Sequence, residues 1–305
     1  MLNNLVFQRV KLDDLDEIIK LFHGVFKKKI TKKFYNWRYF DKGYTSFIAL
    51  FNKKIIAHIG FVKYRFHNNL NFVFSRHSTF VISKFQNKGI YNKLLNYSFS
   101  ILKTKTDYVI AWPNKKNILA SKNHSHFNVI GKYDLFYKNY LSNLGNKFFQ
   151  KINIDFLKQL PIDQKNHLFF KDKKFMEWRY ASYKKNQFYY LNITNLKNFI
   201  FEESKIKKKK IYSIIDYFGK YSNYQNDLKN LIKYLIKNKI SFQLLLPNNY
   251  RKLRYLFNKE SIIKKTQFYI GLYFIGHKKF YKIKIEKKIR NVAKISDTDV
   301  FIKTN

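Results

Sequence analysis

One short segment of the chain occurs twice. Lys32–Tyr39 reads KKFYNWRY, and six of its eight positions are identical in Lys173–Tyr180, which reads KKFMEWRY. The copies lie 141 residues apart in a chain of 305 residues, and they contain two of its three tryptophans. A repeat with a period near half the length predicts two related domains in tandem. Within each domain we expect Trp-Arg-Tyr to be a packing anchor, with the Arg guanidinium on an aromatic face.

The composition provides enough apolar material for two cores. Hydrophobic residues make up 46% of the chain and aromatic residues 19%, which excludes a globally disordered protein. We expect a first domain over residues 1–140, a connection over 141–165, and a second domain over 166–305.

The charge is strongly positive. The chain has 61 Lys and Arg against 19 Asp and Glu, a formal net charge of +42, which is typical of proteins that bind nucleic acid, anionic membranes or polyanionic ligands. Lys, Asn, Ile, Phe and Tyr also have AT-rich codons, so codon usage is an alternative source of the charge. The lysines are scattered, and no helix-turn-helix, RNA-recognition or zinc signature is present, which disfavours a nucleic-acid-binding module.

Several absences narrow the class of protein. There is no cysteine, which excludes disulfides, thiolate nucleophiles and Cys-ligated zinc, and we expect no metal. The longest apolar run, Phe268 to Gly276, is about half as long as a transmembrane helix requires. The first five residues carry no basic n-region, so we expect a cytoplasmic chain without a signal peptide or transmembrane segment.

Hydrophobic periodicity predicts alternating strands and helices. In the first half we expect strands at 5–10, 46–51, 55–64, 70–82, 108–112 and 129–137, with helices after Asp13 and at 90–102 and 117–123. We expect a hairpin turn at Asn52–Lys54 between the second and third of these strands, and Ile90, Leu94, Tyr97 and Ile101 on the inward face of the 90–102 helix. In the second half we expect strands at 188–193, 199–203, 211–217 and 241–246 and a helix at 226–238. This order predicts an α/β fold with a mixed central sheet and flanking helices.

The most informative segment runs from Val81 to Leu95, where a strand passes through a polar turn into an amphipathic helix. Unpaired N–H groups and the dipole at such a helix start form an anion site. Gly89 allows close approach of the backbone, and Lys88 and Lys93 add positive charge, so a pyrophosphate suits this turn. The segment is not a Walker loop, because Gly-Lys-Ser/Thr is missing. A dinucleotide-binding fold is disfavoured, because only one Gly of its fingerprint is present.

Gln86-x-x-Gly89-x-Tyr91 resembles the Arg/Gln-x-x-Gly-x-Gly/Ala signature of the GNAT N-acetyltransferase superfamily. The order of elements in the first half is also similar, and the segment from Arg76 to Asn114 resembles tandem-GNAT members from bacterial surface-polysaccharide gene clusters. The resemblance implies that the first domain binds acyl-CoA, usually acetyl-CoA, with its pyrophosphate on the turn. Tyr91 departs from the signature, so its ring must turn away from the phosphates or pack over them.

The resemblance also implies the residues that contact acyl-CoA. Thr79 and Val81 resemble the positions whose backbone pairs with the pantetheine arm as a further strand would. The full expected set is Thr79, Val81, Gln86, Asn87, Lys88, Gly89, Ile90, Tyr91, Lys93, Asn114 and Asn117.

Acyl transfer to an amine requires a base. Many GNAT enzymes use a Glu on the strand before the turn, but here no Asp or Glu occurs between Asp41 and Asp107. His77 lies on that strand and is our candidate base; a hydrogen-bonded structural histidine is the alternative. Strand alternation predicts His77 and Thr79 on one face and Arg76 and Ser78 on the other.

An acid must then protonate the CoA thiolate. In the family this is often a Tyr after an Asn-x-x-Ala pattern; Asn117–Ala120 matches the pattern, and the Tyr position falls at His124. His124 is therefore the candidate acid, and a surface histidine at a helix end is the alternative. Trp37, Arg38 and Arg76 are the candidates for the acceptor side, where Arg suits a phosphate or carboxylate.

The expected function is acyl-CoA-dependent N-acyl transfer to a small amine, such as an amino sugar or its nucleotide-linked form, by direct attack in a ternary complex. The second half has no comparable turn before its helix, so we expect a degenerate repeat that shapes the acceptor site. Two alternatives remain: a nucleic-acid-binding protein that uses the basic aromatic surface, and an aminoacyl-tRNA-dependent transferase on the same fold. A pyrophosphate-binding turn favours CoA over tRNA as donor.

Overall fold

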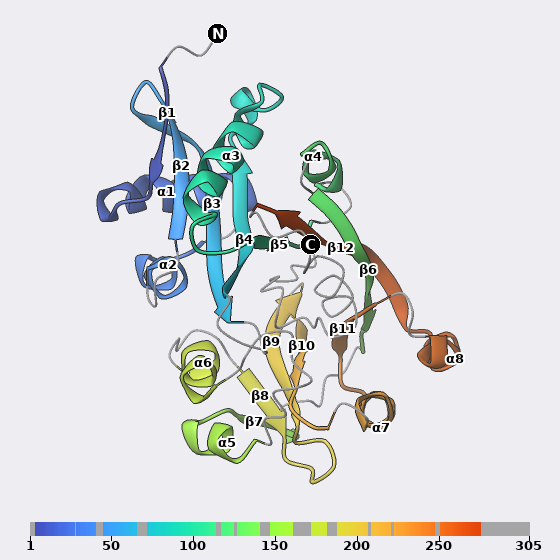
Figure 1. The fold of residues 1–305 in the computed structure, drawn as a ribbon. Coiled ribbons are helices and arrows are strands. Elements are labelled where there is room, and N and C mark those ends of the chain that lie inside the picture. The colour runs from blue at the N-terminus through green and yellow to red at the C-terminus, as the bar shows by residue number, and fades with distance from the viewer. Residues whose placement is uncertain are drawn as a thin grey trace. The chain divides into compact units, whose positions relative to one another are not determined.

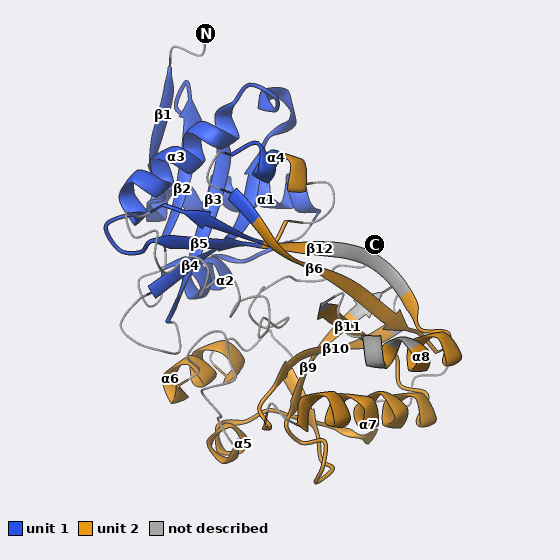
Figure 2. Ribbon diagram, turned by 45° about the vertical axis from the view of Figure 1, so that its right-hand side comes forward, with its two compact units in different colours: residues 1–111, 120–128, 271–283 blue, residues 112–119, 129–270, 284–305 orange. Residues whose placement is uncertain are grey.

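The computed structural model describes residues 4–27, 29–40, 45–65, 72–113, 117–124, 127–140, 147–160, 172–181, 188–206, 209–220, 223–247 and 251–275. The chain forms two compact units (Figure 2). Unit 1 contains residues 1–111, 120–128 and 271–283, and unit 2 contains residues 112–119, 129–270 and 284–305. Asn114 lies outside the described residues.

Unit 1 is a mixed sheet with helices against it (Figure 1). Its strand order is β1-β2-β3-β4-β5-β12, and all described neighbours are antiparallel except β4 and β5. Its strands are β1 (Leu5–Arg9), β2 (Thr45–Phe51), β3 (Lys54–Arg65), β4 (Phe72–Val81), β5 (Tyr108–Ala111) and the end of β12 (Ile263–Phe274). Its helices are α1 (Leu15–Phe26), α2 (Lys32–Tyr39), α3 (Ile90–Leu102) and the second part of α4 (Ile118–Lys122).

Unit 2 is built in the same way. Its strand order is β12-β6-β11-β10-β9-β8-β7, with β10 and β11 parallel. Its strands are β7 (Phe149–Lys151), β8 (Phe188–Leu191), β9 (Phe199–Ile206), β10 (Lys209–Tyr217), β11 (Phe242–Pro247), and most of β6 (Phe127–Lys138) and β12. Its helices are α5 (Ile154–Gln159), α6 (Lys173–Met176), which continues as a π-type turn over Glu177–Ala181, α7 (Tyr224–Lys237) and α8 (Arg251–Lys259).

The two units have matching connectivity. In each, four antiparallel strands lie in chain order, a helix follows, and a fifth strand pairs in parallel with the fourth. The next neighbour of that fifth strand comes from the other half of the sequence, because β12 pairs with β5 and β6 pairs with β11. This exchange explains why the compact units depart from a division at residues 140 and 166. The predicted α/β class with a mixed sheet is confirmed.

Most predicted elements are present, but the buried face of α3 differs from the prediction. Ile90 and Leu94 are buried as expected, whereas Tyr97 and Ile101 are only half-buried. The Tyr97 ring lies 5.9 Å from that of Phe47 on β2. The remaining buried positions of α3 are Leu95, Ser98, Phe99 and Leu102. The helices α2, α5, α6 and α8 and the strands β7 and β12 were not among the predicted elements.

Helices α2 and α3 cover opposite faces of the unit 1 sheet. Gly60 of β3 lies under the ring of Tyr39 from α2. Its neighbour Phe61 contacts Phe47, whose ring in turn contacts Tyr97 of α3. Consecutive residues of a strand point to opposite faces, so α2 packs on the Gly60 face and α3 on the Phe61 face.

A β-bulge interrupts β4. His58 of β3 pairs with Phe80 and Gly60 pairs with His77, so β4 has one residue more than β3 in this interval. Ser78 lies in the bulge with φ +49°. The predicted alternation is therefore wrong beyond His77, because a bulge re-aims the side chains that follow it.

Among the described residues, no helix is both long and apolar enough to cross a membrane. The part of the apolar run from Phe268 to Phe274 belongs to the end of β12; Gly276 lies outside the described residues.

Two glycines provide a test of the packing of unit 1. A Cβ at Gly60 would overlap the Tyr39 ring, whereas a Cβ at Gly24 on α1 would meet open space. We expect Gly60→Ala to lower the free energy of unfolding by about 1–3 kcal/mol, as overpacking does. We expect Gly24→Ala to raise it by up to about 1 kcal/mol, because alanine is the better helix former. Denaturant unfolding of both variants checks this, and equal effects at the two positions would contradict the packing of Tyr39 on β3.

Candidate functional site

The parallel strands β4 and β5 part after a short ladder. Phe74–Arg76 pair with Val109–Ala111, but β4 continues to Val81 while β5 ends at Ala111. From His77 onward, the described residues pair β4 with β3 on one side and show no ladder with β5 on the other. The result is a fork with an open strand edge, and such an edge accepts an extended ligand as an additional strand.

The fork leads directly to the start of α3. After Val81 the chain makes a 3₁₀ turn and reaches Gly89, the N-cap of α3, with φ +72°. No side-chain cap forms at Gly89, and a side chain there would have open space around it. Lys88 and Lys93 are exposed beside it. An uncapped helix start flanked by cations is a site for an anion.

The predicted phosphate-binding residues take different positions in this turn. Asn87 adopts a left-handed conformation with φ +60°, so two residues of the turn, Asn87 and Gly89, have positive φ. The Gln86 side chain donates from Nε2 to the carbonyl of Val81 at 2.9 Å. Gln86 thus closes the turn onto the end of β4, while the Ile90 side chain is buried and anchors the helix start.

The Tyr91 side chain points away from the turn that precedes α3. Its hydroxyl accepts a hydrogen bond from Arg76 Nη1 and lies 3.0 Å from the hydroxyl of Tyr273 on β12. The Tyr91 ring therefore points away from the helix start and leaves it open. This is the first of the two arrangements expected for a Tyr in place of the Gly/Ala of the signature.

Arg76 forms a partly buried cationic cluster at the base of the fork. Its guanidinium donates to Tyr91, to the hydroxyl of Tyr273 at 2.7 Å and to Ser121 Oγ on α4 at 3.2 Å. Burial disfavours the charged form, but the hydroxyls of Tyr91 and Tyr273 outweigh it, and the pKa of Arg76 is raised. Burial is also the main cause of the raised pKa of Tyr273. The cluster therefore holds a positive charge among hydroxyl groups.

This position separates Arg76 from the other two acceptor candidates. Arg76 faces α3, whereas Trp37 and Arg38 lie on α2, on the opposite face of the sheet. Trp37 is 4% exposed and Arg38 is 2% exposed, so neither presents an open surface for a substrate. The Arg38 guanidinium instead lies 5.9 Å from the Phe34 ring and 5.7 Å from the Tyr39 ring. The expectation that Trp-Arg-Tyr is a packing anchor is confirmed.

His124 is buried and packs beside the Arg76 cluster. Its Nε2 lies 2.8 Å from Asn96 Oδ1 on α3, and its ring meets the rings of Phe99 and Tyr273 edge-on at 5.5 and 5.3 Å. The reading as a surface histidine is therefore wrong. The Asn96 bond directs Nε2 towards α3, which disfavours the role as acid. Asn117 belongs to unit 2 and is not placed with the turn.

His77 lies just beyond the point where β4 and β5 part. It pairs with Gly60 in the β3 ladder, directly before the bulge, and its side chain is 9% exposed. His77 is therefore at the base of the fork, next to the open edge that Thr79 and Val81 continue.

A buried network that sequence reasoning missed connects α2 with the bulge. His58 Nδ1 lies 2.8 Å from the Ser78 carbonyl, and Nε2 lies 2.7 Å from the Tyr35 hydroxyl, which is 2.8 Å from Ser46 Oγ. The Tyr39 hydroxyl donates to Ser78 Oγ at 2.5 Å. Burial lowers the pKa of His58 to about 4, so the imidazole is neutral. The available signal was the i, i+4 spacing of Tyr35 and Tyr39 inside the repeated segment.

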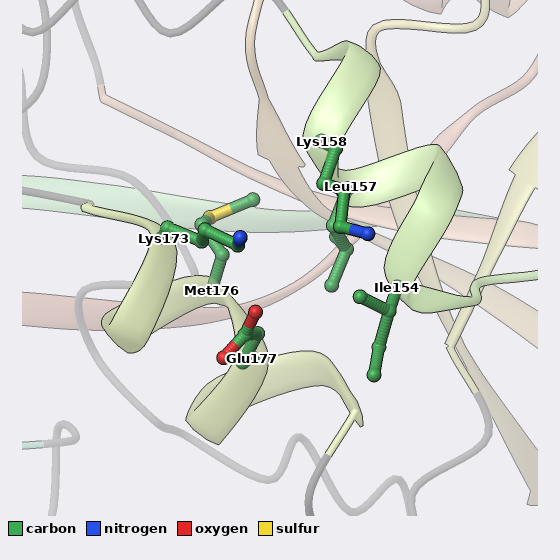
Figure 3. Close-up of a pocket in the computed structure, with 6 residues that line it drawn as sticks. All are labelled: Ile154, Leu157, Lys158, Lys173, Met176 and Glu177. Atoms are coloured by element: carbon green, nitrogen blue, oxygen red, sulfur yellow. The ribbon is translucent and has the colours of Figure 1, made fainter.

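Unit 2 contains a small hollow between α5 and α6 (Figure 3). Its cavity volume is about 130 Å³, and Lys158 at its edge forms an ion pair with Asp155 at 3.2 Å. The lining residues are Ile154, Leu157, Lys158, Lys173, Met176 and Glu177. The hollow is largely apolar and lies beside the second copy of the repeat.

Comparison with solved structures identifies the fold. The chain superposes on a GCN5-related N-acetyltransferase from Anabaena variabilis with a TM-score of 0.61 and 7% identity, covering 89% of this chain and 73% of that one. It matches Saccharomyces cerevisiae N-myristoyltransferase with bound myristoyl-CoA with a TM-score of 0.61 and 10% identity, covering 90% and 81%. A conserved protein of unknown function from Enterococcus faecalis, a probable N-acyltransferase, superposes with a TM-score of 0.58 and 10% identity. The match covers 89% of this chain and 73% of that one. The chain therefore has the fold of the GNAT N-acyltransferases.

No protein-family model and no curated protein matches the sequence. At identities near 10%, the solved structures establish the fold and leave the activity to be argued from the site.

The buried imidazole predicts how stability depends on pH. The pKa of His58 is about 4 in the folded protein and near its ordinary value of 6.5 when unfolded, so below pH 6.5 the unfolded chain binds more protons. The contribution of neutral His58 to the free energy of unfolding is complete above pH 6.5 and is lost as the pH falls towards 4. We expect this loss to lower the free energy of unfolding by about 2 kcal/mol between pH 7 and pH 5. Denaturant unfolding at both pH values should show a smaller loss in His58→Gln, and equal losses in variant and wild type would contradict a neutral buried His58.

Proposed function

We propose that unit 1 binds acyl-CoA and that the protein is an acyl-CoA-dependent N-acyltransferase. One observation carries the proposal: the open edge of β4 leads directly into the uncapped start of α3 at Gly89. An extended pantetheine arm fits the edge at Thr79 and Val81, and a pyrophosphate fits the helix start. The similarity to a structure of N-myristoyltransferase with bound myristoyl-CoA supports this ligand for the fold.

The peptide between Ser78 and Thr79 is suited to polarise the acyl carbonyl. The Ser78 carbonyl accepts from His58 of β3. In a trans peptide the N–H points opposite to the carbonyl, so the Thr79 N–H points away from the His58 ring, and we place the acyl carbonyl on that side. A backbone donor at this place stabilises the oxyanion that forms when an amine attacks a thioester.

His77 is the proposed base. The acceptor amine loses a proton as its nitrogen attacks the thioester carbon, and a neutral imidazole at the base of the fork takes that proton directly or through water. The C–S bond then breaks and the CoA thiolate needs a proton. Because His124 points towards Asn96, we assign the proton donor to Tyr91, whose hydroxyl is held by Arg76, with the Arg76 charge stabilising the anion.

The acceptor class is proposed on the sequence resemblance. Tandem-GNAT members of surface-polysaccharide clusters imply an amino sugar or its nucleotide-linked form, in polysaccharide biosynthesis. Since Trp37 and Arg38 are buried, the acceptor must be recognised by other residues, and unit 2 as a degenerate repeat remains our candidate to supply them.

Ligand binding is tested by thermal stabilisation. Saturating acetyl-CoA should stabilise the wild type by about 2.7 kcal/mol at a hundredfold excess over its Kd. Gly89→Glu should abolish the shift, because a carboxylate and a side chain at φ +72° replace the open helix start. Gly24→Ala is the matched control and should keep the shift. A shift with tRNA or single-stranded DNA and none with acetyl-CoA would reject the proposal in favour of a nucleic-acid-binding protein or an aminoacyl-tRNA-dependent transferase.

Turnover is tested by the release of free CoA thiol with a panel of amino sugars. We expect His77→Ala to lower kcat by about 100-fold or more, the usual contribution of a general base. His23→Ala, which changes an exposed histidine of α1, should leave kcat unchanged. An unchanged rate in His77→Ala would remove His77 from the role of base.

A further inference from the structure

The repeated Trp-Arg-Tyr segment has a structural partner in each unit. In unit 1 the Tyr39 hydroxyl donates to Ser78 Oγ at 2.5 Å, and Ser78 is in the bulge of β4. In unit 2 the Tyr180 hydroxyl donates to Asp216 Oδ2 at 2.6 Å, and Asp216 directly follows the bulged residue of β10. The last residue of both copies therefore bonds to the bulge region of the fourth strand of its own unit.

We propose that Tyr39 and His58 form a bulge clamp, a pair of positioning residues that hold Ser78 so that β4 can receive the acyl donor. This inference rests on the proposed function, because it assigns the clamp to the donor site of unit 1. Tyr39 holds the side chain of Ser78, and His58 holds its carbonyl.

The protons of the network have one consistent arrangement. A carbonyl only accepts, so His58 Nδ1 donates to Ser78, and Nε2 of the neutral ring must accept from the Tyr35 hydroxyl. Tyr35 then accepts from Ser46. All members of this buried chain lie in the interior of unit 1, and a network satisfied in this way fixes the orientation of each member.

The clamp also has steric support. The ring of Tyr39 lies directly over Gly60, where a Cβ would prevent the approach, and Arg38 Nε donates to the Tyr39 hydroxyl at 3.2 Å. Ser78 is held in a left-handed conformation at φ +49°. A non-glycine residue persists in this region only when its surroundings determine it, and such positions concentrate at functional sites.

The consequence for the donor follows from the peptide geometry. As long as His58 holds the Ser78 carbonyl, the Thr79 N–H stays directed away from the His58 ring, where we place the donor carbonyl. Release of the clamp lets this peptide rotate, so the donor carbonyl loses its partner while the core of the unit remains packed.

The first test compares the same change in the two units. Tyr39→Phe and Tyr180→Phe each remove one hydroxyl that donates to a bulge-region side chain. We expect Tyr39→Phe to lower kcat about tenfold or more, since small misplacements at a reacting centre have effects of this order or larger. We expect Tyr180→Phe to leave kcat and the KM for acetyl-CoA within about twofold of wild type. Equal effects of the two variants on kcat would overturn the clamp.

The second test divides the two nitrogens of His58. In His58→Asn the side-chain amide replaces Nδ1 and keeps the bond to the Ser78 carbonyl, whereas in His58→Gln it replaces Nε2 and keeps only the Tyr35 bond. Both lose the ring. We expect His58→Asn to retain at least about a third of wild-type kcat/KM and His58→Gln to lose about tenfold or more. The reverse order, or the same loss in both, would contradict the clamp.

The two proposals fail in different ways. If the wild type shows no thermal shift with acetyl-CoA, the proposed donor site is rejected, and the bulge clamp is rejected with it. If wild type is stabilised and turns over, while Tyr39→Phe and His58→Gln equal wild type in kcat and KM, the donor site stands and the clamp alone is rejected.

Discussion

The short parallel ladder between β4 and β5 is the constraint on which unit 1 depends. Three residues of β4 are paired on both sides, and the following residues are paired on one side only. Buried backbone groups require partners, so a strand with one open edge inside a domain is costly unless a ligand or solvent completes it. The bulge at Ser78 lies on this open stretch, and the uncapped start of α3 at Gly89 follows it along the chain, which is why we propose it as the binding edge of the unit.

Charge has two different uses in this molecule. The exposed Lys88 and Lys93 flank the helix start and raise its attraction for a polyanion. Arg76 is partly buried, and its described partners are hydroxyls of Tyr91, Tyr273 and Ser121. A cation held by hydroxyl groups keeps its charge available to an anion that develops nearby. These few groups give a site-specific meaning to a small part of the +42 net charge.

Local patterns predicted the elements well where apolar spacing and turn residues agree. The helix at 90–102 and the β2–β3 hairpin, with positive φ at Asn52 and Lys53, match their predictions. The faces of β4 beyond His77 could not be predicted, because a bulge depends on cross-strand pairing with His58 and Gly60. His124 has the sequence context of a helix end, yet its environment comes from α3 and β12, which lie far away in the chain.

The sequence by itself determined the α/β class, the duplication and the strand–turn–helix around Gly89, since each of these follows from the order of neighbouring residues. The tertiary structure decided which side chains meet. It exchanged β6 and β12 between the halves, brought Tyr273 to Arg76 across 197 positions, and joined the first Trp-Arg-Tyr copy to Ser78. These contacts depend on long-range strand pairing and packing, and no local pattern of residues contains that information.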